Sequence, residues 1–238
     1  MLRTAFAIIA CVLFLSAETV AQDYRQAYEK GLEAATSGDY AVAVKEWRPL
    51  AENGYAQAQY DLGLLYRHGR GVDRDYEQAV KWFRKAADQG LASSQYALAT
   101  LYVAGRGVDK DLSKALTWYR KAAAQGSAAA KNNIAYMYRY GKGVPKNIGE
   151  AMKWYLDAGS QGYVPALDNL GMLYANGNRV QRDYVQAYKW LALATSFGST
   201  RGARYLRYVT KKMTTAQVDE AKILAAAWIA DFQKRSQQ

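Results

Sequence analysis

A 36-residue period runs through most of this 238-residue chain. Residues 54–89 and 90–125 are identical at 20 of 36 aligned positions. Three Gly-x-Gly-Val motifs and one variant, Gly-Asn-Arg-Val, begin 36 residues apart at Gly69, Gly105, Gly141 and Gly177. Self-similarity at a fixed spacing of this size is typical of tandem arrays, in which each unit buries its apolar face against its neighbours.

Each period predicts two helices joined by the glycine motif. Ala58, Leu62 and Tyr66 fall on one face of the first helix at i, i+4 spacing. Gly69 can adopt the left-handed conformation that follows a helix end. Asp75 can cap the second helix with its carboxylate, and the equivalent caps in the later units are Asp111, Asn147 and Asp183.

The second helix carries an apolar face of alanines and aromatic residues at helical spacing, formed in the first full period by Ala79, Trp82, Phe83 and Ala86. We interpret the recurring tryptophans as core residues rather than as a ligand track, because they share a face with the periodic alanines. We therefore expect the following side chains to be largely buried: Leu62, Tyr66, Trp82, Trp118 and Trp154.

The predicted fold is all-α, a right-handed α-solenoid of antiparallel helix pairs with a C-terminal capping helix. We expect four parts: a cleaved signal peptide (1–21), an N-terminal unit (22–53), four 36-residue units (54–198), and an incomplete last unit with the cap helix (199–238). In the N-terminal unit Gly38-Asp39-Tyr40 stands in place of the glycine loop, so this unit resembles an ordinary tetratricopeptide repeat. Thr214 and Gln217 form a capping-box pattern that opens this last helix. Arg179 replaces the second loop glycine, so we expect the fourth loop to be strained or bent.

The repeated residues resemble the Sel-one-like repeat (SLR), a subclass of the tetratricopeptide-like repeats. The shared pattern comprises the leucine–glycine pair and tyrosine of the first helix, the glycine loop, and the Ala-x-x-Trp stretch of the second helix, over residues 54–198. The resemblance implies a role as a non-catalytic adaptor in assembly, signalling or host contact. In such folds the first helix of each pair lines the concave surface.

Residues 1–21 have the order of a secretory signal: Arg3, a mostly apolar stretch over 4–15, and small Thr19 and Ala21 before the expected cleavage site. We expect cleavage and a periplasmic or secreted protein without a membrane span. A membrane anchor is one alternative, although the apolar run is short for a bilayer. A lipoprotein modified at Cys11 is another.

The chain has one cysteine and one histidine, which argues against zinc sites and histidine-dependent catalytic triads. We interpret His68 as an ordinary loop residue and Asp73 and Asp75 as loop-end residues. A Ser-x-x-Lys motif is absent. We therefore expect no enzymatic activity, no metal and no cofactor.

Non-core positions on the first helices differ from unit to unit, which favours recognition of one irregular partner over a uniform solvated face. Their tyrosine and arginine content is typical of interface hot spots. The candidate partner-binding residues, for an unknown protein or peptide, are Tyr60, Leu64, Arg67, Tyr96, Thr100, Asn132, Tyr136, Arg139, Asp168 and Met172.

Positive charge is concentrated near the C-terminus of a chain whose formal net charge is +11. No acidic residue occurs from Tyr184 to Val218. This basic stretch is either a solvated face or a docking site for an acidic protein, an anionic lipid or a cell-wall polymer, and nucleic acid is not expected for an exported protein. The candidate patch comprises Arg201, Arg204, Arg207, Lys211 and Lys212.

Overall fold

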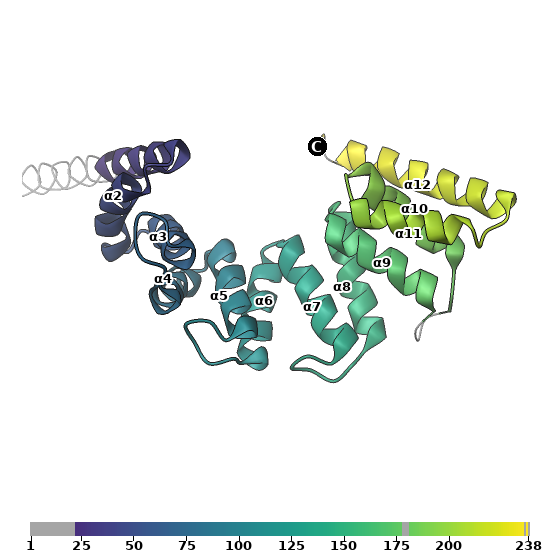
Figure 1. Ribbon diagram of the computed structural model, residues 1–238, viewed down its shortest axis with the longest axis horizontal. Coiled ribbons are helices and arrows are strands. Elements are labelled where there is room, and N and C mark those ends of the chain that lie inside the picture. Colours follow the sequence, from purple (N-terminus) through teal and green to yellow (C-terminus); the bar gives the residue numbers. More distant parts are fainter. Residues whose placement is uncertain (1–21, 178–180, 236, 238) are drawn as a thin grey trace, which may run out of the picture. The chain divides into compact units, whose positions relative to one another are not determined.

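The computed structural model describes residues 22–177, 181–235 and 237, and the regular structure within these ranges is helical. The fold is an all-α repeat solenoid of consecutive helix pairs, as predicted (Figure 1). The expected signal peptide lies outside the described residues. The chain divides into two compact units between Lys110 and Asp111, and each unit is described in turn.

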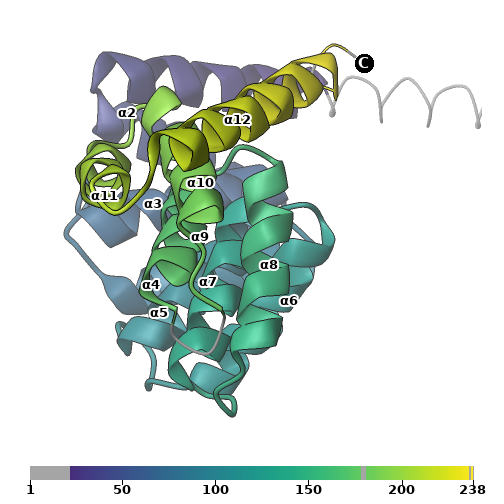
Figure 2. The ribbon, with the colours of Figure 1, turned by 90° about the vertical axis from the view of Figure 1, so that its right-hand side faces the viewer.

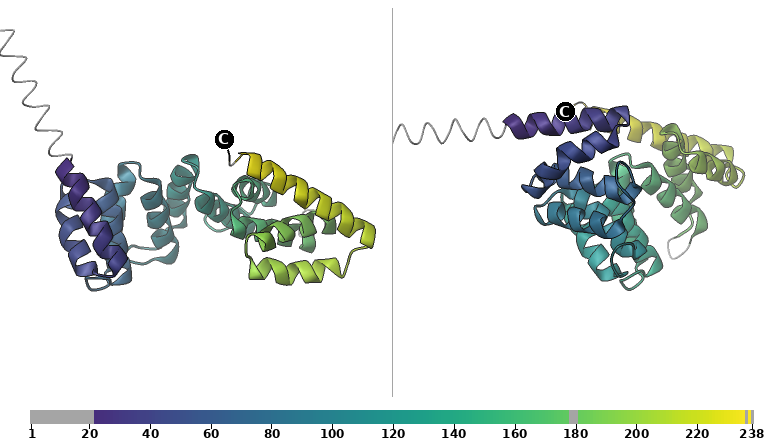
Figure 3. Two further views of the ribbon diagram at one scale, coloured as in Figure 1. Left: turned by 90° about the horizontal axis from the view of Figure 1, so that it is seen from above. Right: turned by 60° about the vertical axis from the view of Figure 1, so that its left-hand side comes forward.

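The N-terminal unit contains a helical segment over residues 22–37, followed by α2 (Tyr40–Glu52), α3 (Ala56–His68), α4 (Tyr76–Asp88) and α5 (Ala92–Ala104). The first segment lies against α2 (Figure 3). Gly63 makes close packing of α3 and α4 possible, because a Cβ there would lie 2.7 Å from the Phe83 ring. The main core side chains of this unit are Trp47, Leu50, Leu62, Leu65 and Trp82.

The C-terminal unit contains α6 (Leu112–Ala124), α7 (Ala128–Tyr140), α8 (Ile148–Ser160), α9 (Val164–Asn176), α10 (Tyr184–Ser196), α11 (Thr200–Thr210) and α12 (Thr215–Arg235). Tyr155 of α8 is fully buried, and this burial raises the pKa of its hydroxyl to about 12. It packs in a core with Ile148, Leu167, Leu170, Trp190 and Leu193.

The helix caps form where the sequence predicts them. Gly69 follows α3 in the left-handed conformation, with φ of 67°. The Asp75 carboxylate accepts hydrogen bonds from the backbone N–H groups of Glu77 and Gln78 at 2.9 and 3.0 Å. The same type of side-chain cap is made at Asp111, Asn147 and Asp183.

The second glycine of the first three loops allows a close contact between neighbouring repeats. A Cβ on Gly107 would collide with the backbone carbonyl of Tyr76, where α4 begins, and Gly71 has the same relation to Tyr40. A Cβ on Gly143 would lie 2.6 Å from the Cβ of Leu112, the first residue of α6. In these three loops the second glycine therefore lets the loop pack against the start of the second helix of the preceding unit. Arg179 lies outside the described residues.

Burial of Leu62, Trp82 and Trp118 is confirmed. Tyr66 and Trp154 are less completely buried, and each packs against a core cluster rather than within it. The Tyr66 hydroxyl accepts a part-buried hydrogen bond from Arg48 at 3.0 Å.

Trp154 is more exposed than Trp82 and Trp118 because the side chain one turn later in its helix is different. Lys85 and Lys121 place their ammonium groups 4.5 and 4.1 Å from the ring centroids of Trp82 and Trp118. At Trp154 the corresponding residue is Asp157, which pairs with Lys131 at 2.9 Å instead. The lysine stem that shields the other rings is therefore missing beside Trp154.

The C-terminal helix α12 packs along α10 (Figure 2). Its predicted capping box is present, since the Thr214 N–H donates to Gln217 Oε1 at 2.9 Å and the Gln217 N–H donates to Thr214 Oγ1 at 3.3 Å. Trp228 stacks on Phe232 with ring centroids 5.0 Å apart, and Trp190 of α10 meets Trp228 edge-on. The helix thereby covers apolar surface that another repeat would otherwise cover.

Candidate partner-binding surfaces

The predicted contact residues of the N-terminal unit are all half-buried. On α3 these are Tyr60, Leu64 and Arg67, and on α5 they are Tyr96 and Thr100. Burial raises the pKa of the Tyr60 hydroxyl, as does the neighbouring charge of Asp61. The Thr100 hydroxyl donates to the Ala97 carbonyl at 2.6 Å, so this side chain is engaged by its own helix.

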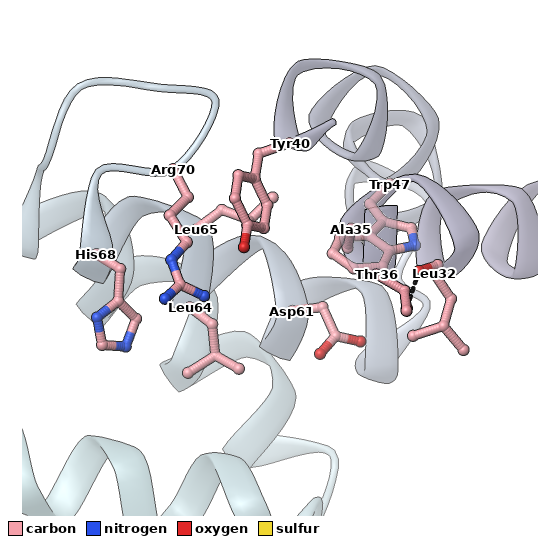
Figure 4. A pocket seen from close by; sticks show the side chains of 10 residues that line it. All are labelled: Leu32, Ala35, Thr36, Tyr40, Trp47, Asp61, Leu64, Leu65, His68 and Arg70. Atoms are coloured by element: carbon pink, nitrogen blue, oxygen red, sulfur yellow. Dashed lines mark hydrogen bonds between the residues drawn. The ribbon is translucent and has the colours of Figure 1, made fainter. Parts of the chain in front are cut away.

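A cavity of about 320 Å³ lies beside Leu64, between the helical segment 22–37 and α3 (Figure 4). Asp61 points into it near Leu32 and Thr36, whereas His68 and Arg70 lie toward its opposite end. The cavity is lined by Leu32, Ala35, Thr36, Tyr40, Trp47, Asp61, Leu64, Leu65, His68 and Arg70.

Asp61 is a half-buried carboxylate whose hydrogen-bond donors are neutral. The Tyr28 hydroxyl donates to Asp61 Oδ2 at 2.7 Å, and the Gln57 amide donates to the same oxygen at 3.2 Å. Burial raises the pKa of the Asp61 carboxyl, although both hydrogen bonds oppose the shift. Burial also raises the pKa of the Tyr28 hydroxyl, and the Asp61 contact adds to this effect.

The opposite end of the cavity is basic. The guanidinium of Arg70 lies 5.1 Å from the centroid of the Tyr40 ring. Burial lowers the pKa of His68, and the charges of Arg67 and Arg70 lower it further, so His68 is mainly neutral at pH 7. The cavity thus has an anion at one end, an arginine at the other, and leucines between them.

In the C-terminal unit, Asn132 and Asp168 are buried rather than accessible, which corrects the prediction for these two positions. Asn132 Oδ1 accepts a hydrogen bond from Asn169 at 3.1 Å, linking α7 to α9. The Ser199 hydroxyl lies 2.8 Å from Asp168 Oδ2, linking α9 to the start of α11. Both side chains hold neighbouring repeats together.

The remaining predicted residue pair on α7 is accessible to different degrees. Tyr136 is 48% exposed, and Arg139 is half-buried. Tyr136 packs against Tyr140, which is also 48% exposed, with ring centroids 4.6 Å apart. The Arg139 guanidinium lies 5.1 Å from the centroid of the Tyr140 ring. We call Tyr136, Arg139 and Tyr140 the α7 aromatic patch.

The predicted basic patch lies on α11 and the turn that follows it, and all five of its side chains are exposed. Arg201 donates to the Sδ of half-buried Met172 at 2.8 Å, which connects the patch to one predicted contact residue. Lys212 lies 5.9 Å from the centroid of the Tyr208 ring. Among the described residues, no carboxylate lies within salt-bridge distance of Arg201, Arg204, Arg207, Lys211 or Lys212.

Two residues of these surfaces, Asp61 and Tyr140, were not predicted from the sequence. The signal that could have found them is variation between repeats. The place of Asp61 is taken by Ala97, Asn133 and Asn169 in the later units. His68, Ala104 and Asn176 stand at the place of Tyr140.

Over the described ranges, there is no cluster of three or more His, Cys, Asp or Glu side chains that could hold a metal ion. No helix in this part of the chain combines the length and the apolar character needed to cross a bilayer.

The sequence and the fold both match known repeat proteins. The family model described as Sel1 repeat matches residues 56–91, 92–127, 128–163 and 164–196. A Sel1 repeat protein from Oxalobacter formigenes is 30% identical, with a TM-score of 0.73 over 88% of this chain and 82% of the other. A protective antigen with an SLR fold from uropathogenic Escherichia coli is 31% identical, with a TM-score of 0.75 over 86% of this chain and 46% of the other.

Two further similarities concern proteins with a described role. An immunity protein from Pseudomonas aeruginosa is 25% identical, with a TM-score of 0.53 over 88% of this chain and 81% of the other. DAP3-binding cell death enhancer 1 from Rattus norvegicus is 43% identical over 44 residues, which span 18% of this chain and only 9% of the rat protein. The four matched repeats and the Oxalobacter structure establish that this chain belongs to the Sel1 repeat family.

Proposed function

We propose that this protein is an exported, non-catalytic scaffold that binds a protein partner through the first helices of its repeats. The α7 aromatic patch carries the proposal. Most aromatic side chains of the repeats pack into the core or against it, whereas Tyr136 and Tyr140 expose about half of their surface side by side. Paired tyrosines beside an arginine are typical of the anchors that dominate binding energy in protein interfaces.

The related proteins support a binding role. The rat relative is named for binding DAP3, and the Pseudomonas and Escherichia coli relatives are described as an immunity protein and a protective antigen. The order of residues 1–21 supports export, which would place the partner in the periplasm or outside the cell.

The test is affinity capture from bacterial envelope extract with the full-length protein as bait. Replacing Tyr136 and Tyr140 together by Ala should weaken capture of the principal partner by about 1–3 kcal/mol, the usual cost of losing an interface anchor. Ile223→Ala is the matched control, because Ile223 is a large apolar side chain that is 70% exposed on α12, outside both candidate surfaces. Equal capture by the double variant and the control would reject the α7 aromatic patch as the binding surface.

A second function is favoured by the basic patch on α11, namely binding to an acidic protein, an anionic lipid or a cell-wall polymer. Five exposed cations without a salt-bridge partner among the described residues create a local positive field. Reversing Arg204 and Lys211 to Glu should weaken such binding strongly at low salt and little at high salt. Capture that fails only in this variant, and that disappears with salt in the parent, would favour this function over the first.

A further inference from the structure

We propose that the cavity between residues 22–37 and α3 is a socket for a basic side chain, Lys or Arg, of the partner polypeptide. We call it the Asp61 socket, with the lining residues given above. The inference rests on the proposed protein-binding function and adds the chemistry of one contact.

The first argument is the missing counter-charge. Among the described residues, no Lys, Arg or His lies within salt-bridge distance of the Asp61 carboxylate, although the chain has 32 Lys and Arg against 21 Asp and Glu. Its neighbours, the Tyr28 hydroxyl and the Gln57 amide, supply hydrogen bonds but no positive charge. A partly buried carboxylate of this kind opposes folding when ionised, unless a cation joins it.

The second argument is the shape and lining of the cavity. A volume of about 320 Å³ lies at the small end of ligand pockets, which suits one long side chain rather than a large cofactor. Leu32, Ala35 and Leu64 supply apolar surface beside Asp61. Lys and Arg bury their aliphatic stems on such surface while the charged end reaches a polar group.

The third argument fixes the direction of the occupant. Arg70 lies toward the other end of the cavity (Figure 4), so a cation placed there would be repelled. The charged end of the incoming side chain therefore lies at Asp61, and the backbone of the partner segment lies toward the open side. An acidic side chain would meet the opposite arrangement, since Asp61 would repel it.

The test uses a defined peptide, N-acetyl-Leu-Arg-Leu-amide, titrated into the full-length protein and followed by NMR. The control peptide carries citrulline, which has the shape of arginine without its charge. We expect the arginine peptide to shift the signals of Tyr28, Gln57 and Leu64. The citrulline peptide should bind at least about tenfold more weakly, because a charge-assisted hydrogen bond is replaced by a neutral one.

Protein variants assign the binding to one carboxylate. Asp61→Asn should lose the preference for arginine over citrulline, whereas Asp73→Asn, which changes an exposed loop carboxylate, should keep it. Leu32→Lys should block the socket from within, because Leu32 lines it and is 49% exposed. This second variant also serves if Asp61→Asn does not fold, which its circular dichroism spectrum would reveal.

Three results would contradict the Asp61 socket. The first is equal affinity for the two peptides, and the second is an unchanged preference for arginine over citrulline in Asp61→Asn or Leu32→Lys. The third is no shift of the Tyr28, Gln57 and Leu64 signals at about 10 mM arginine peptide, a concentration well above a millimolar dissociation constant. The capture experiment on the α7 aromatic patch is independent of these results. A captured partner that binds Asp61→Asn as well as the parent would reject the socket and leave the scaffold function standing.

Discussion

Replacing Gly107 by Ala tests whether the second loop glycine is required for contact between repeats. Gly107 has φ of 67°, in the left-handed region, where a residue with a Cβ costs about 1–2 kcal/mol. The added methyl group would also collide with the Tyr76 carbonyl at the start of α4. Because both sides of this contact include backbone, neither can turn away as a side chain could.

The magnitude follows from adding the two costs. Overpacking at a site that relaxes only partly costs about 1–3 kcal/mol, so Gly107→Ala should lower the free energy of unfolding by about 2–5 kcal/mol. Gly90→Ala is the matched control, because Gly90 also has a positive φ, 97°, but a Cβ there would meet nothing within 4 Å. The control should show the backbone cost alone.

The assay is urea unfolding of both variants and the parent, followed by tryptophan fluorescence, since Trp82 and Trp118 lie on either side of the loop in sequence. The difference between the two variants measures the close contact, and we expect about 2 kcal/mol. If Gly107→Ala loses no more stability than Gly90→Ala, the contact with Tyr76 is not a constraint, and the second glycine serves only the loop conformation.

Three further changes test the core, the repeat junctions and a buried carboxylate. Trp118→Ala should lower the free energy of unfolding, measured by thermal unfolding, by about 3–5 kcal/mol, and Trp154→Ala should lower it clearly less because Trp154 is only half-buried. Equal losses in the two variants would contradict the shielding of Trp118 by lysine. Tyr138→Phe removes the hydroxyl that accepts a hydrogen bond from Arg120 at 2.8 Å. Because this hydrogen bond is exposed, its loss should lower the free energy of unfolding, measured in urea, by about 1 kcal/mol or less. Burial raises the pKa of the Asp168 carboxyl in the folded state. Ionisation of this carboxyl therefore lowers the stability of the protein as the pH rises from the unfolded-state pKa through the folded-state pKa. Asp168→Asn should be more stable than the parent at pH 7, and this difference should vanish toward pH 3.

The repeat architecture is predictable because it rests on residues that recur. A glycine that ends a helix, an aspartate that caps the next one and a buried alanine–tryptophan face act locally, so each can be recognised at fixed spacing. The caps at Asp75 and Asp111 are predictable for this reason. The period alone does not indicate the greater exposure of Trp154. That exposure depends on Asp157, which stands where the two preceding units have a lysine that shields the tryptophan.

The candidate surfaces were predictable only in part, because a non-repeating position can be either buried or accessible. Asn132 and Asp168 differ from their counterparts in other repeats, and both are used inside the fold. Their partners, Asn169 and Ser199, come from the next unit, about one period later in sequence. A helical-face argument applied to one repeat does not include that neighbour, so it cannot show which polar residues are covered by it.

The two carboxylates with raised pKa values show how such positions can be separated once the structure is known. Asp168 is buried, and the Ser199 hydroxyl that contacts both of its oxygens also caps α11 by accepting from the Gly202 N–H at 2.8 Å. Its surroundings are completed by the chain itself, which indicates a structural role. Asp61 has hydrogen-bond donors on one side and an open cavity on the other. Variation between repeats therefore marks a candidate binding residue only where the varying side chain still faces open space, and this condition selects Asp61 and Tyr136 as candidates over Asp168 and Asn132.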